Sequence, residues 1–180
     1  MEINVIDVSD SAFQRPKLTL KDLGKTIIET NGAVSNAVGV MIRDVISAAG
    51  SPGSISVLRI YSHGNEGIFN VAGGVISGEE DGNAIAVSNI GQFEPDLRRL
   101  APYFAPHARV ELHGCLVGKG KDGEKLLRKL AGVWHVRVQA TTSESSMGAV
   151  QFTGGVVEAH PSGGLTSTPG TPIASERKSR

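Results

Sequence analysis

Two short segments, Ser62–Gly64 and His113–Cys115, carry the side chains best suited to chemistry in this chain of 180 residues. The first follows the largely apolar run 55–61, and the second follows the shorter run 108–112. Apolar and β-branched runs that stop at glycine are typical of strands. In an open parallel α/β sheet, ligands bind at the carboxyl ends of the strands. The pattern therefore predicts a reactive histidine and a reactive cysteine at the same edge of a sheet.

Cys115 is the only cysteine of the chain, and its surroundings suit a nucleophile. A cysteine attacks a carbonyl carbon as the thiolate. A glycine-rich segment leads from Cys115 into a predicted helix, Asp122–Ala131, and it contains Lys119 and Lys121. Helix N-termini and lysines both favour negative charge. We therefore expect the thiolate of Cys115 to be stabilised.

His63 supplies the second half of a cysteine–histidine pair. A histidine at the end of a neighbouring strand can pass the proton of the thiol to a leaving amine. The backbone N–H groups of Gly64 and Cys115 are candidates for an oxyanion hole, because a glycine lets a substrate approach the backbone closely. The intervening chain is long enough for a hairpin, a helix and a returning parallel strand.

The elements that must position these residues alternate between strands and helices. Strands are predicted over Ile3–Val8, Ile55–Tyr61, Ala108–Leu112 and Trp134–Ala140. Helices are predicted over Thr19–Thr30, Ala33–Ala49, Phe93–Phe104 and Asp122–Ala131. The segment Gly67–Val87 is predicted to form a β-hairpin or two short strands, and Val150–Glu158 a further strand or hairpin arm. This alternation predicts an α/β fold, a three-layer sandwich with a mostly parallel central sheet and helices on both faces. Arg109 and Glu111 depart from that pattern, because a strand buried on both faces is apolar throughout.

The composition predicts one folded domain, residues 1–160, followed by a disordered tail, residues 161–180. The tail is rich in Ser, Thr, Pro and Gly and ends in a charged run, so it can bury little apolar surface.

The charge balance excludes some classes of partner. Lysine plus arginine number 18 and aspartate plus glutamate number 18, so no basic surplus favours nucleic acid or an anionic membrane. No apolar stretch is long enough to span a bilayer, and the first residues do not resemble a signal peptide. A lone cysteine suits a reducing compartment, and a cytoplasmic location is expected. The oligomeric state cannot be read from the sequence.

The arrangement of these motifs resembles the caspase-hemoglobinase fold (clan CD) of cysteine peptidases. The resemblance covers roughly residues 55 to 142, and it is nearest to a bacterial caspase-like domain of poorly characterised function. It rests on a Ser-His-Gly strand end within Ile60–Gly67, a glycine-rich hairpin within Phe69–Gly78, and a Gly-Cys segment with its loop and helix within Leu112–Leu130.

The resemblance implies specific roles for residues of this chain. His63 matches the catalytic histidine of the family, Cys115 the nucleophile and Gly64 the oxyanion-hole glycine. The segment Gln139–Glu144 lies where such peptidases place a strand of the specificity pocket. The candidates for substrate contact are Glu66, His113, Thr141, Ser143 and Glu144. The implied substrate is a peptide or protein, the reaction requires no cofactor or metal, and self-processing is one form it can take.

Several alternatives remain open from the sequence alone. Cys115 could be an inert buried cysteine. His63, His113 and Cys115 could hold a metal, although no CxxC or HxxxH spacing supports one. The segment Gly118–Gly123 superficially suggests a phosphate loop but lacks the GxxxxGK[ST] spacing. The alternative to an enzyme is a catalytically inactive caspase-fold module that binds or scaffolds other proteins.

Overall fold

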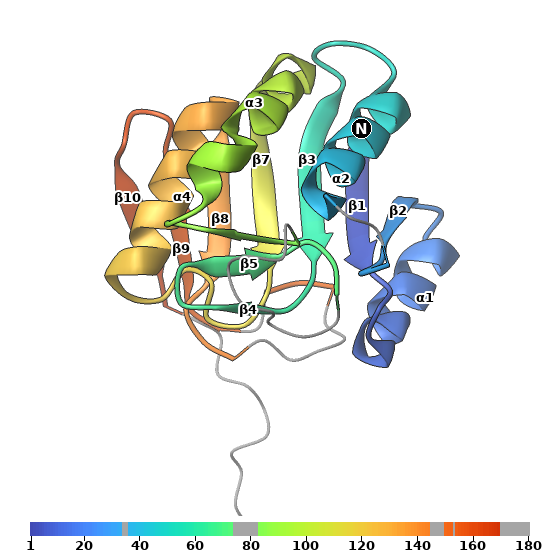
Figure 1. The fold of residues 1–180 in the computed structure, drawn as a ribbon, viewed down its shortest axis with the longest axis horizontal. Coiled ribbons are helices and arrows are strands. Elements are labelled where there is room, and N and C mark those ends of the chain that lie inside the picture. Colours follow the sequence, from blue (N-terminus) through green and yellow to red (C-terminus); the bar gives the residue numbers. More distant parts are fainter. Residues whose placement is uncertain (34–35, 74–82, 145–149, 153, 170–180) are drawn as a thin grey trace, which may run out of the picture.

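The computed structural model describes residues 1–33, 36–73, 83–144, 150–152 and 154–169. These residues form a seven-stranded sheet of order β10-β9-β8-β7-β3-β1-β2 and a small sheet β4-β5-β6 (Figure 1). The strands are β1 (Glu2–Asp7), β2 (Thr26–Thr30), β3 (Ile55–Tyr61), β4 (Gly64–Asn65), β5 (Ile68–Asn70), β6 (Ala84–Ala86), β7 (Phe104–His113), β8 (Arg137–Thr141), β9 (Val156–Ala159) and β10 (Leu165–Thr168). The helices are α1 (Gln14–Asp22), α2 (Ala37–Ala49), α3 (Ile90–Leu100) and α4 (Gly120–Trp134), and the 3-10 turns are η1 (Ser11–Phe13) and η2 (Ala101–Tyr103).

The mostly parallel sheet predicted from the sequence is confirmed. Strands β8, β7, β3, β1 and β2 are parallel neighbours, and β9 and β10 extend the sheet in antiparallel pairs. All four predicted strands lie in this sheet, although Trp134 belongs to the end of α4 rather than to β8. Strands β5 and β6 pair antiparallel within the predicted hairpin region Gly67–Val87, β4 adds a further antiparallel strand before it, and residues 74–82 lie outside the described part.

The predicted helix over Thr19–Thr30 is helical only as far as Asp22 and is wrong beyond it. Helix α1 begins earlier, at Gln14, and ends at Asp22, Gly24 takes a left-handed conformation (φ +64°), and β2 follows as a parallel neighbour of β1. A glycine with positive φ is a common end of a helix. The residues after it, Thr26, Ile27 and Ile28, are β-branched, which favours a strand.

One face of the large sheet carries the main hydrophobic core. Helices α2, α3 and α4 lie side by side over this face (Figure 1). Ile60, Leu112 and Val138 of the sheet and Val45 and Leu127 of the helices are all fully buried in one cluster. Because strand side chains alternate between faces, the remaining positions of these strands point the other way.

The second face is covered more thinly than the sequence predicts. Of the described elements, only η1 and α1 supply it with core residues, through Phe13 and Leu20, which pack on Ile6 and Tyr61. The described residues thus form three layers, but the third layer lies mainly over β1 and β3.

Beyond α1, the second face presents a row of polar side chains. The strand register pairs Asn4 with Arg59, Arg59 with Glu111, Glu111 with Gln139, and Gln139 with Glu158. The row therefore runs across β1, β3, β7, β8 and β9, with one polar residue from each strand. The Nε atom of Arg59 donates to Glu111 Oε2 at 2.9 Å, and the amide of Gln139 donates to Glu158. Arg109 and Glu111 of β7 are polar because they lie on this second face, which no continuous layer of helices covers.

The composition predicts disorder from residue 161, and this is wrong for the first part of the segment. Leu165–Thr168 form β10, the edge strand, which pairs antiparallel with β9. Three of its four side chains are exposed, so pairing of the backbone rather than burial accounts for this strand. Residues 170–180 lie outside the described part of the chain.

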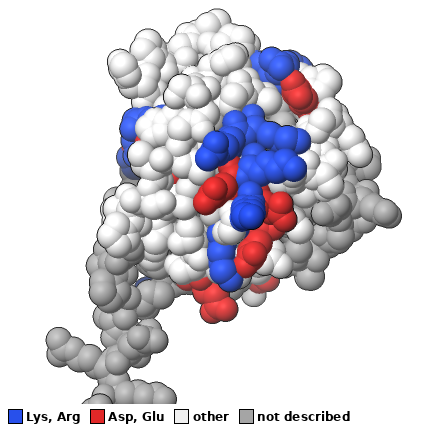
Figure 2. Space-filling view, turned by 90° about the vertical axis from the view of Figure 1, so that its left-hand side faces the viewer, with Lys and Arg blue, Asp and Glu red and all other residues white. Residues whose placement is uncertain are grey.

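The side of the molecule formed by α4, β9 and β10 carries basic and acidic side chains close together (Figure 2). The exposed charged residues of α4 are Lys121, Asp122, Glu124, Lys125, Arg128 and Lys129. The two signs are interspersed along this helix, so the charges offset one another locally.

Candidate active site

Strands β1, β3, β7 and β8 all end at the same edge of the sheet (Figure 1). In this sheet the chain passes from β1 outward to β2 and afterwards from β3 to β7 and β8 on the other side. In open α/β sheets, ligands bind outside the carboxyl ends of the strands at such a reversal of strand order. His63 follows β3, and Asp10 follows β1, so both residues lie at the reversal between these two strands.

The register of β3 and β7 places the histidine and the cysteine at equivalent positions. Tyr61 pairs with His113, and the N–H of Ser62 donates to the carbonyl of His113 at 3.4 Å. His63 and Cys115 each lie two residues beyond the pair Tyr61–His113 on adjacent parallel strands. The structure therefore brings together the two turns that the sequence predicts to carry the reaction.

The two turns approach so closely that only glycine fits between them. A Cβ atom on Gly64 would lie 2.3 Å from Cγ2 of Val117 and 3.2 Å from the carbonyl oxygen of Cys115. A Cβ atom on Gly114 would lie 3.1 Å from the carbonyl oxygen of Ser62 and 3.3 Å from the nitrogen of Gly64. The histidine turn and the cysteine turn thus leave no room for a side chain at Gly64 and little at Gly114.

His63 is held by an aspartate that the sequence analysis missed. Its Nε2 lies 2.9 Å from Oδ2 of Asp10, and the edge of its ring packs on Phe13, with ring centroids 5.1 Å apart. The other carboxylate oxygen of Asp10 accepts the N–H of Ala12 at 2.8 Å and so begins η1. The N–H of Ala12 and the His63 ring together hold the pKa of the Asp10 carboxyl below its usual value.

Cys115 is half-buried in the turn between β7 and α4. The next residue, Leu116, has a left-handed backbone (φ +59°), which a non-glycine residue adopts rarely. The N–H of Leu116 donates to the carbonyl of Ser143 at 3.1 Å, and the N–H of Gly118 donates to the carbonyl of Thr141 at 2.9 Å. The cysteine turn is therefore fixed to the segment that follows β8.

Two of the predicted substrate-contact residues lie beside this turn. Thr141 is fully buried, and its hydroxyl accepts the N–H of Ser143 at 3.1 Å, so Thr141 shapes the turn. Ser143 is half-buried next to the cysteine turn, while Glu144 is exposed at the end of the described segment. The structure thus keeps Ser143 and Glu144 as candidates for substrate contact and gives Thr141 a supporting role.

Glu66, a predicted substrate-contact residue, and Lys119, a predicted source of positive charge beside the cysteine, form an ion pair with each other. Their side chains meet at 2.7 Å, and both are about half exposed. Because an exposed ion pair contributes little net field, the positive charge predicted beside Cys115 is largely neutralised at Lys119. The other predicted feature is confirmed, since α4 begins at Gly120, five residues after Cys115.

His113 points away from its predicted role at the site. Its ring is buried in a stack between Tyr61 (4.5 Å between centroids) and Phe152 (4.3 Å) on the second face of the sheet. Its Nε2 lies 3.1 Å from Glu111 Oε2. Burial lowers the pKa of His113 despite the opposing effect of Glu111, so the ring is neutral near pH 7. His113 therefore supports the sheet face rather than the substrate.

Among the described residues, no three His, Cys, Asp or Glu side chains are arranged to hold a metal ion. The set His63, His113 and Cys115 is therefore not arranged as a metal site either. Within the same residues, every helix is too short or too polar to cross a membrane.

One protein-family model matches this chain. A model described as a domain of unknown function, DUF4347, matches residues 36–156, which is more than half of the chain. The chain belongs to this family. The DUF4347 match includes His63 and Cys115 but not Asp10, which precedes it. A search of curated proteins finds no match.

Proposed function

We propose that this protein is a caspase-like cysteine endopeptidase that cleaves peptide bonds through an acyl-enzyme on Cys115. The observation that carries this proposal is the equivalent placement of His63 and Cys115 beyond a paired position on adjacent parallel strands. The contact of Asp10 with Nε2 of His63 supports it further, because it leaves Nδ1 as the ring nitrogen for proton exchange.

The architecture supports the resemblance to the caspase-hemoglobinase fold. The strand order reverses between β1 and β3, which puts the histidine turn at the position where ligands bind in such sheets and the cysteine turn at the end of the adjacent strand β7. The β4-β5-β6 unit lies where the resemblance implies a glycine-rich hairpin, and α3 is the helix for which the spacing of His63 and Cys115 leaves room.

In the first step, the thiol proton of Cys115 resides on His63, and the Cys115 Sγ thiolate attacks the carbonyl carbon of the substrate. A bond forms between Sγ and carbon, and the electron pair of the carbonyl moves to its oxygen. Donors for that oxygen are the N–H groups of Gly64 and Cys115, whose turns touch. The bond between carbon and nitrogen then breaks, and His63 gives its proton to the leaving amine.

In the second step, His63 accepts a proton from water, and the water oxygen attacks the thioester carbon. The bond between carbon and sulfur breaks, the acid product leaves, and the thiolate of Cys115 is restored. Asp10 does not touch the substrate in this scheme. It is a positioning residue that holds Nε2 of His63, so that Nδ1 is the ring nitrogen that exchanges protons.

A direct test is the rate at which iodoacetamide alkylates Cys115 at neutral pH, followed by intact mass. We expect the wild-type protein to react faster than free cysteine, and His63→Ala to slow the reaction by about tenfold or more. His160→Gln, a histidine in the turn between β9 and β10, is the matched control and should react like wild type. Equal rates for wild type and His63→Ala would contradict the pair.

The same experiment separates an enzyme from an inactive module of the same fold. An inactive module predicts slow alkylation in every variant. An active peptidase also predicts that a library of peptidyl acyloxymethyl ketones labels wild-type Cys115 and leaves Cys115→Ala unlabelled. The members of the library that react would define the preference for the residue before the scissile bond.

A further inference from the structure

A cavity of about 350 Å³ lies on the second face of the large sheet, where the end of α1 and residues 150–152 meet the strands. This volume is at the lower end of the range that binds small organic molecules. Its lining includes neither His63 nor Cys115, nor any residue of the two turns that carry them. The chain thus has a concave site that the proposed peptidase reaction does not use.

The floor of this cavity is a chain of alternating charges from β1, β3 and β7. Glu2 accepts from Nζ of Lys25 at 3.1 Å and from Nη1 of Arg59 at 3.2 Å. Glu111 accepts from Nε of Arg59 at 2.9 Å and from Nε of Arg109 at 2.7 Å. The charged lining therefore consists of three cations and two carboxylates, and the chain of charges begins and ends with a cation. One positive charge is in surplus on the floor of the cavity.

Arg109 carries the charge that remains available. Among the described residues, only its Nε atom has a partner, which is Glu111, and its two terminal nitrogens have none. Its side chain is 35% exposed, whereas the side chain of Arg59, which contacts both carboxylates, is 15% exposed. A guanidinium with two free terminal nitrogens binds a carboxylate through parallel N–H bonds.

The rest of the lining is largely apolar and lies on the same face of the sheet. Leu20 of α1 packs on Tyr61, and Phe152 stacks on His113 with 4.3 Å between ring centroids. Phe152 is half-buried, and Leu23, just after α1, is 61% exposed, so carbon surface remains open to a ligand at this cavity. An apolar surface beside a free cation suits a ligand with both kinds of group.

We propose that this cavity binds a small monocarboxylate with a short apolar chain. The carboxylate lies against the terminal nitrogens of Arg109 and supplies the negative charge that the floor lacks. The apolar chain packs on Leu23 and Phe152. The proposal goes beyond the peptidase reaction and does not depend on the activity of Cys115.

A titration followed by proton–carbon NMR of the methyl groups tests this site in the full chain. The probes are hexanoate, its neutral counterpart hexanamide, and acetate, which lacks the apolar chain. We expect hexanoate to shift the methyl signals of Leu23 and Val150 with saturation. Hexanamide and acetate should each bind at least about tenfold more weakly, because one lacks the charge and the other the apolar surface. Equal binding of hexanoate and either other probe, or no binding of hexanoate, would overturn the proposal.

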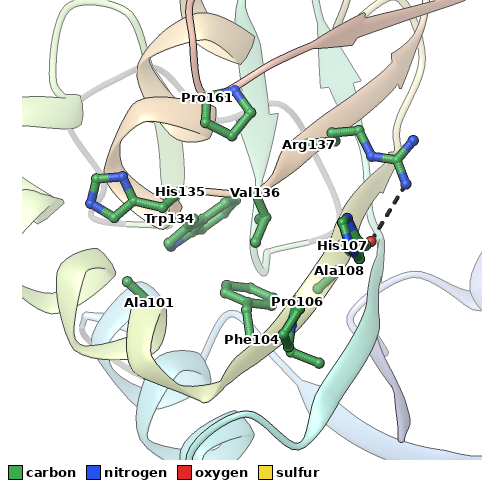
Figure 3. A pocket seen from close by; sticks show the side chains of 11 residues that line it. Ala101, Phe104, Pro106, His107, Ala108, Trp134, His135, Val136, Arg137 and Pro161 are labelled. Atoms are coloured by element: carbon green, nitrogen blue, oxygen red, sulfur yellow. Dashed lines mark hydrogen bonds between the residues drawn. The ribbon is translucent and has the colours of Figure 1, made fainter.

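The variant Arg109→Gln assigns the charge to its residue. It should weaken hexanoate by about tenfold and leave hexanamide unchanged. Arg137→Gln is the matched control, because Arg137 is the register partner of Arg109 on β8. Figure 3 shows the guanidinium of Arg137 bonded to the carbonyl of His107 beside a separate cavity. Arg137→Gln should therefore bind all probes like wild type, and equal effects of the two variants would overturn the proposal.

A second variant keeps the test decisive if Arg109→Gln does not fold. Leu23→Ser changes an exposed side chain outside the helices and strands, so it should leave the fold intact. It should weaken hexanoate and hexanamide by the same factor, about threefold or more, because it removes apolar contact and no charge. Unchanged affinity for hexanoate in Leu23→Ser would place the ligand elsewhere and overturn the proposal.

Discussion

Glu111 is the most heavily bonded charge of the second sheet face. Its carboxylate accepts from Nε of Arg59 at 2.9 Å and from Nε of Arg109 at 2.7 Å, and it lies 3.1 Å from Nε2 of His113. Burial by itself raises the pKa of this carboxyl, but the bonds from His113, Arg59 and Arg109 outweigh it and hold the pKa at about 2. The folded protein therefore depends on an ionised Glu111.

This gives a prediction for stability against pH. The pKa of Glu111 is lower in the folded than in the unfolded chain, so its stabilisation is fully present above about pH 4.5 and is lost as the pH falls toward 2. The loss amounts to about 3 kcal/mol for a depression of this size. Urea unfolding at pH 7 and pH 3 should show Glu111→Gln to be less stable at pH 7 and less sensitive to pH across this window. Glu94→Gln, which breaks an exposed pair with Arg98, should behave like wild type, and an equal effect of both variants would refute the assignment.

A second prediction concerns the effect of Asp10 on the proposed pair of His63 and Cys115. Asp10→Asn keeps the shape of the side chain and removes the charge beside His63 Nε2, so alkylation of Cys115 should slow by about two- to fivefold, as expected for a partly exposed pair. The double variant Asp10→Asn/His63→Ala should be no slower than His63→Ala alone, because Asp10 acts through His63. Both single variants should melt near the wild-type temperature. An additive loss in the double variant would show that Asp10 acts on Cys115 by another route.

At the residue scale, the sequence predicts the reacting pair but not its support. His63 and Cys115 stand out because each follows an apolar run that stops at glycine, which is a local signal. Asp10 lies in a polar loop and meets His63 only through the pairing of β1 with β3, a contact across 53 residues. The ion pair of Glu66 with Lys119 is equally long-range, and so the sequence suggested two separate roles for these residues.

At the element scale, the contact between the β3 and β7 turns depends on Gly64. We predict that Gly64→Ala destabilises the protein by about 1–3 kcal/mol, because its Cβ would overlap Cγ2 of Val117 and crowd the carbonyl of Cys115. Thermal unfolding measures this loss, and the alkylation rate of Cys115 reports the displaced turn. Gly132→Ala is the control, because Gly132 lies in α4 with nothing within 4 Å of an added Cβ, and it should stabilise the protein by about 0.5–1 kcal/mol. Destabilisation by Gly132→Ala, or none by Gly64→Ala, would contradict this account of the packing.

Helices and strands with a regular spacing of apolar residues are predicted well from the sequence. Strands that depend on backbone pairing with a neighbouring strand are not. The helix over 37–49 and the strand over 55–61 follow directly from regular apolar spacing. Strand β2 has five residues between a helix and a loop, and its place is set by backbone pairing with β1. Strand β10 lies in a segment rich in Ser and Thr, where composition alone indicates disorder, and it depends on β9 in the same way.

At the scale of the whole molecule, β10 closes one side of the sheet. We predict that a chain ending at His160 melts about 2–4 °C below a chain ending at Pro169, since it loses the β9–β10 pairing and the partly buried Leu165. Differential scanning calorimetry of the two chains provides the comparison. Identical melting temperatures would mean that β10 adds nothing to the stability of the sheet.

The position of β1 has a consequence for where this protein can be divided. The segment that matches DUF4347, residues 36–156, omits β1, yet β1 lies between β2 and β3 and pairs with both. A fragment cut at those limits would retain His63 and Cys115 but expose the inner edge of β3 and bare the sheet beneath α2. Unpaired central strands of this kind associate with one another in solution. The recognisable region and the autonomous folding unit are therefore different stretches of this chain, and β1, which joins the sheet from outside the match, is followed by the aspartate that holds His63.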